Sequence, residues 1–313
     1  LGAQVRGDRG SGIRETCERL HDPALLGDEH TAVRGHLDVH RVLEAAHYGR
    51  LLEACGQRRR TGDARRDERQ ALPPALRVAL DFYPTAFIPF VFESLGPLIP
   101  AARGAPRDDV LIRWDRALFG ADPTVWLERF VSPFGNDFFF IAYTTYYFLP
   151  LVLGGLLWER NLPEARRFIF GLTFCYYVSY AGYFTIPALG PRFALADRQT
   201  ISLLTTPVSR AIAEAINQVE HTKLDVFPSG HTMIAIAVLV FAYRWARRAF
   251  WVMLPIAVCL LISTVYCRYH YVVDVLAGLI LALLVVPLGN AFYDRLLRAG
   301  LGPRRAPDQR SRS

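Results

Sequence analysis

Residues 267–278 read CRYHYVVDVLAG and open the last long apolar run of the chain. The stretch places His270 four residues before Asp274. On a helix, residues four apart lie on the same face, so this carboxylate can hold the imidazole. Because ionisable residues at the mouth of a membrane span are costly, the pair predicts a functional site.

The composition indicates a membrane protein. The chain has 313 residues, of which 52% are hydrophobic and 21% are charged. Its apolar residues form runs of roughly 20 residues, the length that a helix needs to cross a bilayer. The sequence therefore predicts an all-α, polytopic membrane protein with six transmembrane helices. We expect these helices at about residues 75–100, 138–158, 168–187, 231–243, 251–266 and 271–291.

Three further parts of the chain are expected from its charge pattern. Residues 110–119, in the first outer loop, mix charged and apolar side chains and predict a short interfacial helix. Residues 1–75 predict a polar, arginine-rich N-terminal arm in the cytoplasm, either solvated or loosely ordered, ahead of a membrane domain at 76–293. Residues 294–313 predict a basic C-terminal tail.

The arginines between the apolar runs indicate the orientation of the chain. If the N-terminus is cytoplasmic, six spans return the C-terminus to the cytoplasm, together with the arginine-rich turns. The net charge of +7 is then an orientation signal, and no nucleic-acid-binding motif accompanies it. In this topology His231, His270 and Arg192 share the extracytoplasmic face of a plasma or inner membrane.

The block Pro228-Ser229-Gly230-His231 predicts the second part of the site. The first backbone N–H groups of a helix are unpaired and carry partial positive charge. Ser229, Gly230 and the start of the helix can therefore bind a phosphate. His231, in the first turn, can donate a proton to a leaving oxygen.

His270 is the better candidate for the nucleophile, because Asp274 can fix its tautomer and stabilise the positive charge that develops. Arg192 and Arg268 can bind phosphate oxygens through their guanidinium groups. These residue types predict phosphoryl transfer through a phosphohistidine. The chemistry requires no metal and no cofactor, and the sequence shows no acidic cluster typical of Mg²⁺ sites.

Each of these residues also has a structural interpretation. His231 can be a helix-start histidine that faces water, and Ser229-Gly230 can be only a turn and cap. His270 and Asp274 can form a structural pair near a helix start. We favour the functional interpretation because these residues fall on one side of the predicted topology. A transporter needs ionisable residues near the middle of the membrane, and a structural membrane protein would tolerate the loss of both histidines.

The blocks at 228–231 and 270–274 resemble the second and third signatures of the type 2 phosphatidic acid phosphatase superfamily. The resemblance covers roughly residues 76–293. It implies a six-helix membrane bundle with its site at the extracytoplasmic surface. It also implies His270 as the nucleophile, Asp274 as its partner and His231 as the general acid.

Two positions depart from the pattern of that superfamily. Thr264 stands where the third signature has an arginine, and Arg268 is the candidate substitute. Thr185 stands where the first signature has a lysine, so only Arg192 is carried over from that block. The sequence of residues 263–274 resembles the inositol-phosphorylceramide synthase branch more closely. That branch transfers a phospho-headgroup to a lipid alcohol.

The sequence thus predicts a membrane-embedded, metal-independent phosphohydrolase or phosphotransferase that acts on lipid-linked phosphate esters. Inositolphosphotransferase-type transfer to a lipid alcohol is the alternative within the same chemistry. The expected partners are a lipid phosphate substrate and membrane lipids, without nucleic acid. The sequence carries no signal for an oligomeric state.

Overall fold

The computed structural model describes residues 72–160, 162–220 and 222–301. Most of these residues are helical, and none of them forms a strand. One compact unit is Asp81–Tyr293, and the other joins Leu1–Leu80 to Asp294–Ser313. Most of the predicted arm and tail therefore lies outside the described residues. Within the second unit the structure describes only the first turns of one helix and the last turns of another.

The long helices of the described part follow the predicted apolar runs. They are α3 (Pro74–Arg103), α6 (Pro133–Arg160), α7 (Leu162–Tyr183), α10 (Gly230–Trp245), α11 (Arg247–Tyr266) and α12 (Val272–Arg298). Four of them, α3, α6, α11 and α12, are long and apolar enough to cross a membrane. These four helices confirm the prediction of an all-α membrane protein.

The predicted count of six spans requires that α7 and α10 also cross the membrane, and this stays a prediction. The first turns of α7 carry Glu164, Arg166 and Arg167, which lower its mean hydropathy. Helix α10 is apolar but has only 16 residues. At 1.5 Å per residue it is about 24 Å long, which is less than the hydrocarbon core of a typical bilayer.

Within the unit Asp81–Tyr293, the core lies between α6, α7, α10, α11 and α12. Side chains from all five helices are almost fully buried there, including Leu153, Phe168, Met233, Leu260 and Ala282. Between helices in a membrane, such packing stabilises the bundle mainly through van der Waals contact.

Asp81 is a charged residue inside an apolar helix, and it is paired. It lies in α3, within the span predicted at residues 75–100. Its Oδ1 is 3.0 Å from Nη2 of Arg166, and the indole of Trp158 donates to its Oδ2 at 3.2 Å. The pairing satisfies a carboxylate that would otherwise be costly among apolar side chains.

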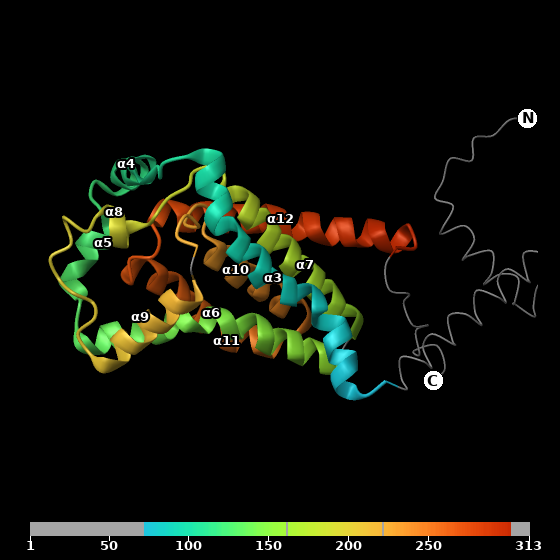
Figure 1. Ribbon diagram of the computed structural model, residues 1–313. Helices are drawn as coiled ribbons and strands as arrows, with labels where there is room; N and C mark the ends of the chain where they lie inside the picture. The colour runs from blue at the N-terminus through green and yellow to red at the C-terminus, as the bar shows by residue number, and fades with distance from the viewer. Residues whose placement is uncertain (1–71, 161, 221, 302–313) are drawn as a thin grey trace, which may run out of the picture. The chain divides into compact units, whose positions relative to one another are not determined.

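Short helices gather at one end of the long helices, where α12 begins (Figure 1). We call this group the cap. It consists of α4 (Asp108–Phe119), α5 (Pro123–Trp126), the 3-10 helix η2 (Leu127–Phe130), α8 (Pro191–Ala194) and α9 (Pro207–Val219).

Helix α4 is the short helix predicted in the first outer loop. It ends at Gly120, whose φ of 72° is in the left-handed region that glycine adopts at low cost. One face of α4 buries Asp108, Leu111 and Asp115. That the helix lies at a membrane interface stays a prediction.

Candidate active site

His231 and His270 meet at the capped end of the bundle. His231 is the second residue of α10, and His270 lies in the turn between α11 and α12. Nδ1 of His231 is 3.0 Å from Nε2 of His270, although 39 residues separate the two in the sequence. The histidines are 8% and 3% exposed, respectively, so they form a buried pair.

Asp274 lies on the other side of His270. Its Oδ2 is 3.2 Å from Nδ1 of His270 and accepts a hydrogen bond from the backbone N–H of Tyr271 at 3.1 Å. The predicted pair is therefore in contact, but not along one helix. His270 precedes the first residue of α12, so the contact forms across the start of that helix.

A tight turn directs His270 toward His231. The carbonyl of Thr264 accepts hydrogen bonds from the backbone N–H groups of Tyr269 and His270, both at 3.0 Å. Within the turn Arg268 has a φ of 64°, in the left-handed region that non-glycine residues rarely adopt. Such a conformation costs about 1–3 kcal/mol and persists only where surrounding contacts hold it.

The side chain of Arg268 supplies such contacts. Its Nη2 is 2.7 Å from Oε1 of Glu128 and donates to the carbonyl of Ile201, also at 2.7 Å. Its Nη1 donates to Oε1 of Gln199 at 3.3 Å. The structure thus gives Arg268 a buried carboxylate partner in the cap, and among the described residues no hydrogen bond joins its guanidinium to either histidine. The contact with phosphate stays a prediction for this residue.

Two buried carboxylates of α4 hold the segments on either side of the site. Asp115 accepts hydrogen bonds from the backbone N–H groups of Val272 and Val273, at 3.2 and 2.9 Å. Asp108 accepts from the backbone N–H groups of Leu189 and Gly190, both at 2.9 Å. Burial raises the pKa of Asp115, and the hydrogen bonds from the backbone N–H groups of Val272 and Val273 oppose the shift.

Sequence reasoning missed both of these aspartates. The signal was their spacing of seven residues, which places them on one face of a helix. Nothing in the sequence, however, marks which backbone groups that face would meet.

Ser229 caps α10. Its Oγ accepts hydrogen bonds from the backbone N–H of Thr232 at 3.2 Å and from the hydroxyl of Thr232 at 3.0 Å. The backbone N–H of Ser229 donates to the carbonyl of Asp274 at 3.1 Å, which joins the starts of α10 and α12. Ser229 is therefore the N-cap of α10, as its structural interpretation expected. Its contact with phosphate stays a prediction.

Two positions near Ser229 have no room for a side chain, and both are glycine. A Cβ on Gly230 would lie 2.5 Å from the hydroxyl oxygen of Tyr183. A Cβ on Gly278 would lie 2.5 Å from the carbonyl oxygen of Ser229. Both positions bring the starts of α10 and α12 close to their neighbours.

Arg192 lies at the edge of the site, in α8. Its guanidinium carbon is 4.5 Å from the ring centroid of Tyr269, and its Nη1 donates to Oδ1 of Asn217 at 3.1 Å. Tyr269 stacks on Tyr143 at 4.5 Å, and Tyr143 is 4.8 Å from the ring of His231. The guanidinium is therefore two aromatic rings away from His231.

Glu220 is a buried carboxylate at the C-terminus of α9, and sequence reasoning did not identify it. Its Oε1 is 3.9 Å from Nε2 of His231. The hydroxyls of Tyr147 and Tyr143 donate to the same oxygen at 2.6 and 3.2 Å. Burial raises the pKa of Glu220, while these hydroxyls and Arg192 oppose the shift.

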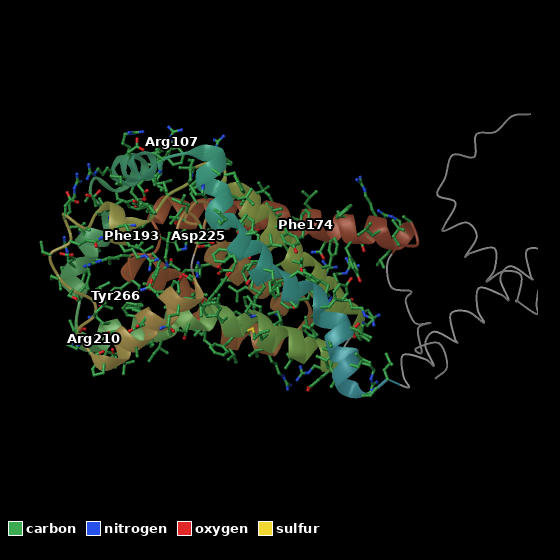
Figure 2. All side chains as sticks on the ribbon, viewed as in Figure 1. Arg107, Phe174, Phe193, Arg210, Asp225 and Tyr266 are labelled. Atoms are coloured by element: carbon green, nitrogen blue, oxygen red, sulfur yellow. The ribbon has the colours of Figure 1, made fainter. Side chains whose placement is uncertain are left out.

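Asp225 is another acidic residue at the capped end, where Phe193 and Tyr266 also lie (Figure 2). Burial and the charge of Glu220 raise the pKa of Asp225 to about 7. Burial lowers the pKa of His270, but the carboxylates of Asp274, Asp225 and Glu220 raise it by more, so the net shift is upward.

Within the described residues, no group of three or more histidine, cysteine, aspartate or glutamate side chains is arranged to hold a metal ion. Each of the two imidazoles has one carboxylate beside it, Asp274 at 3.2 Å from His270 and Glu220 at 3.9 Å from His231. This arrangement suits acid–base and nucleophilic chemistry at nitrogen.

Residues 109–288, which span α4 to α12 and include both histidines, match the family model of the PAP2 superfamily. The chain belongs to the PAP2 superfamily. A PA-phosphatase related-family protein of Dictyostelium discoideum is 23% identical over an alignment of 215 residues, and the match covers 59% of this chain and 38% of that protein. The chain thus matches well under half of that relative's length. No match to a solved structure was found.

Membership of the PAP2 superfamily confirms the resemblance carried by the blocks at 228–231 and 270–274. The assignment to the inositol-phosphorylceramide synthase branch stays a prediction.

Proposed function

We propose that this PAP2 superfamily protein is a membrane phosphatase or phosphotransferase that acts on lipid-linked phosphate esters through a phosphohistidine at His270. One observation carries the proposal. Asp274, His270 and His231 form a buried chain with successive contacts of 3.2 and 3.0 Å. A carboxylate, a nucleophile and an acid in this order are the parts that phosphoryl transfer through histidine needs.

The first half of the reaction consumes the ester. Nε2 of His270 attacks phosphorus, a nitrogen–phosphorus bond forms, and the bond from phosphorus to the leaving oxygen breaks. His231 gives its proton to that oxygen. Asp274 stabilises the positive charge on His270. The incoming phosphate displaces the direct contact between the two rings.

The second half regenerates the enzyme. The oxygen of water or of an alcohol attacks phosphorus, and the nitrogen–phosphorus bond breaks. His231 takes up the proton that this oxygen loses. The phosphate is expected to lie against Ser229, Gly230 and the start of α10, with Arg192 at the edge of the site.

An open cleft supports a lipid substrate. It has a volume of about 370 Å³ and lies between α7, the 222–229 connection and α12. Its lining is mainly apolar and includes Gly182, Phe227, Pro228, Ala277, Leu281 and Leu284. Pro228 directly precedes Ser229, and Ala277 is one helical turn from Asp274. We expect the hydrocarbon chain of the substrate to occupy this cleft.

The proposal includes six membrane spans, with α7 and α10 crossing beside α3, α6, α11 and α12. The termini would then be cytoplasmic and the site would face the extracytoplasmic side of a plasma or inner membrane. Trp114, Leu118 and Phe119 are exposed on α4, which supports contact of that helix with the membrane interface.

Transfer to a lipid alcohol is the second candidate. Thr264 favours it, because this side chain is buried where phosphatases of the superfamily are expected to carry an arginine. Both candidates share the phosphohistidine and differ in the acceptor.

The test uses purified protein in detergent with EDTA and a panel of labelled lipid phosphates, with and without inositol-lipid donors and lipid alcohols. We expect release of inorganic phosphate or appearance of a labelled alcohol product, and inhibition by vanadate. Turnover that depends on added metal, or no turnover on any substrate of the panel, would contradict the proposal.

A further inference from the structure

We propose that Glu220 is a positioning residue for His231, so that Asp274, His270, His231 and Glu220 act as one chain of alternating carboxylates and imidazoles. The inference rests on the proposed function, because it assigns a partner to the general acid of that reaction.

The two imidazoles are arranged alike. Nδ1 of His270 faces the carboxylate of Asp274, and its Nε2 faces His231. Nδ1 of His231 faces His270, which leaves Nε2 on the opposite side of the ring. That Nε2 is buried and has no hydrogen-bond partner among the described residues. Glu220 Oε1, at 3.9 Å, is within ion-pair distance of it.

Glu220 is held in this position from the other side. The hydroxyl of Tyr147 donates to its Oε1 at 2.6 Å, and that of Tyr143 at 3.2 Å. The ring of Tyr146 lies 4.2 Å from that of His231 and limits its rotation. Because the carboxylate is only 9% exposed, its attraction for a protonated imidazole is weakly screened by water.

This arrangement fixes where the proton of His231 goes. With one proton on Nε2 facing Glu220, the transferable proton is on Nδ1, the nitrogen that faces His270 and the incoming ester. After His231 has protonated the leaving oxygen, Nδ1 is free to accept the proton of the attacking water or alcohol. Glu220 thereby favours the protonated form of His231 without itself losing or gaining a proton.

The leaving oxygen distinguishes this role from a structural one. An alkyl phosphate releases a poor leaving oxygen that needs a proton, whereas an aryl phosphate releases a phenolate that hardly needs one. Loss of general acid catalysis therefore slows alkyl substrates selectively. A general distortion of the site slows both substrates.

The test compares Glu220→Gln with the wild-type full chain in detergent on one alkyl and one aryl phosphate. We expect kcat/KM to fall by about 10²-fold on the alkyl phosphate and far less on the aryl phosphate. Glu214→Gln, at an exposed acid on the same helix, is the matched control and should leave both rates unchanged.

Equal losses on the two substrates, or no loss on either, would overturn the role of Glu220. If Glu220→Gln fails to insert, Glu220→Asp replaces it, because that variant keeps the charge but withdraws it from His231, and the same selectivity is expected. A wild-type protein that cleaves neither phosphate would contradict the proposed function itself, which separates the two failures.

Discussion

Asp115 of α4 accepts a hydrogen bond from the backbone N–H of Val273, 2.9 Å away in the first turn of α12. Val273 directly precedes Asp274, and the neighbouring Val272 donates to the same carboxylate. A helix of the cap thus holds the start of α12, next to the proposed nucleophile His270 and its partner Asp274.

This contact predicts the effect of Asp115→Ala. Removing the carboxylate leaves two N–H groups at the start of α12 without an acceptor, which costs about 1–3 kcal/mol per buried group. We expect a lower Tm in detergent and a lower kcat, measured together. Asp109→Ala, at an exposed position of the same helix, is the control. A Tm equal to that of the wild type would contradict the role of Asp115.

The carboxylates near His270 predict the pH dependence of activity. Because they raise the pKa of His270, this histidine stays protonated, and so non-nucleophilic, to higher pH than an ordinary one. Asp225→Asn removes one of these charges, so the pKa of His270 should fall. The acidic limb of kcat/KM against pH should then move to lower pH.

A pH profile of Asp225→Asn beside Asp197→Asn checks this expectation, since Asp197 is exposed and outside the site. The limb should stay in place for Asp197→Asn. An unchanged limb, or one that moves to higher pH, in Asp225→Asn would show that Asp225 does not act on His270.

The cleft predicts selectivity for long-chain substrates. Ala277→Trp should fill it and raise KM for a long-chain lipid phosphate by roughly tenfold, since pocket contacts of this size are worth 1–3 kcal/mol. KM for a short-chain soluble phosphate should not change, because that substrate does not reach the cleft. Leu283→Trp, at an exposed position of α12 outside the cleft, is the control. Equal effects on both substrates would place the hydrocarbon chain elsewhere.

The ion pair of Arg268 and Glu128 predicts a structural effect. Breaking a buried pair leaves one charge without its partner, at a cost of about 3–5 kcal/mol. Arg268→Gln and Glu128→Gln should therefore each lower the Tm, and the double variant should lose less than the sum of the two. If Arg268 instead binds substrate phosphate, Arg268→Gln raises KM while Glu128→Gln does not, and the double-mutant cycle shows no coupling.

The sequence predicted the features that depend on local pattern. Apolar runs identified the long helices, and the mixture of charged and apolar residues at 110–119 identified α4. The spacing of His270 and Asp274 predicted their contact. The short length of α10 and the charged start of α7 explain why two of the six predicted spans are not established by length and hydropathy.

The features that it did not predict depend on contacts across the fold. Glu220 reaches His231 from the end of α9, and Asp115 reaches Val273 from α4, so neither contact follows a sequence spacing. The charge of Arg268 and its position two residues before His270 led to the prediction that it binds phosphate. Its partner Glu128 lies 140 residues away in the sequence, so no local pattern indicates the pair.

The most direct test of the phosphohistidine is to locate the transferred phosphoryl group. Wild-type protein is mixed with a lipid phosphate, quenched within a turnover and digested for mass spectrometry, with His270→Ala treated in parallel and checked for membrane insertion. We predict a phosphoryl group on His270 in the wild type, and neither label nor turnover in His270→Ala. A phosphoryl group on another residue, or turnover by an inserted His270→Ala protein, would contradict the account.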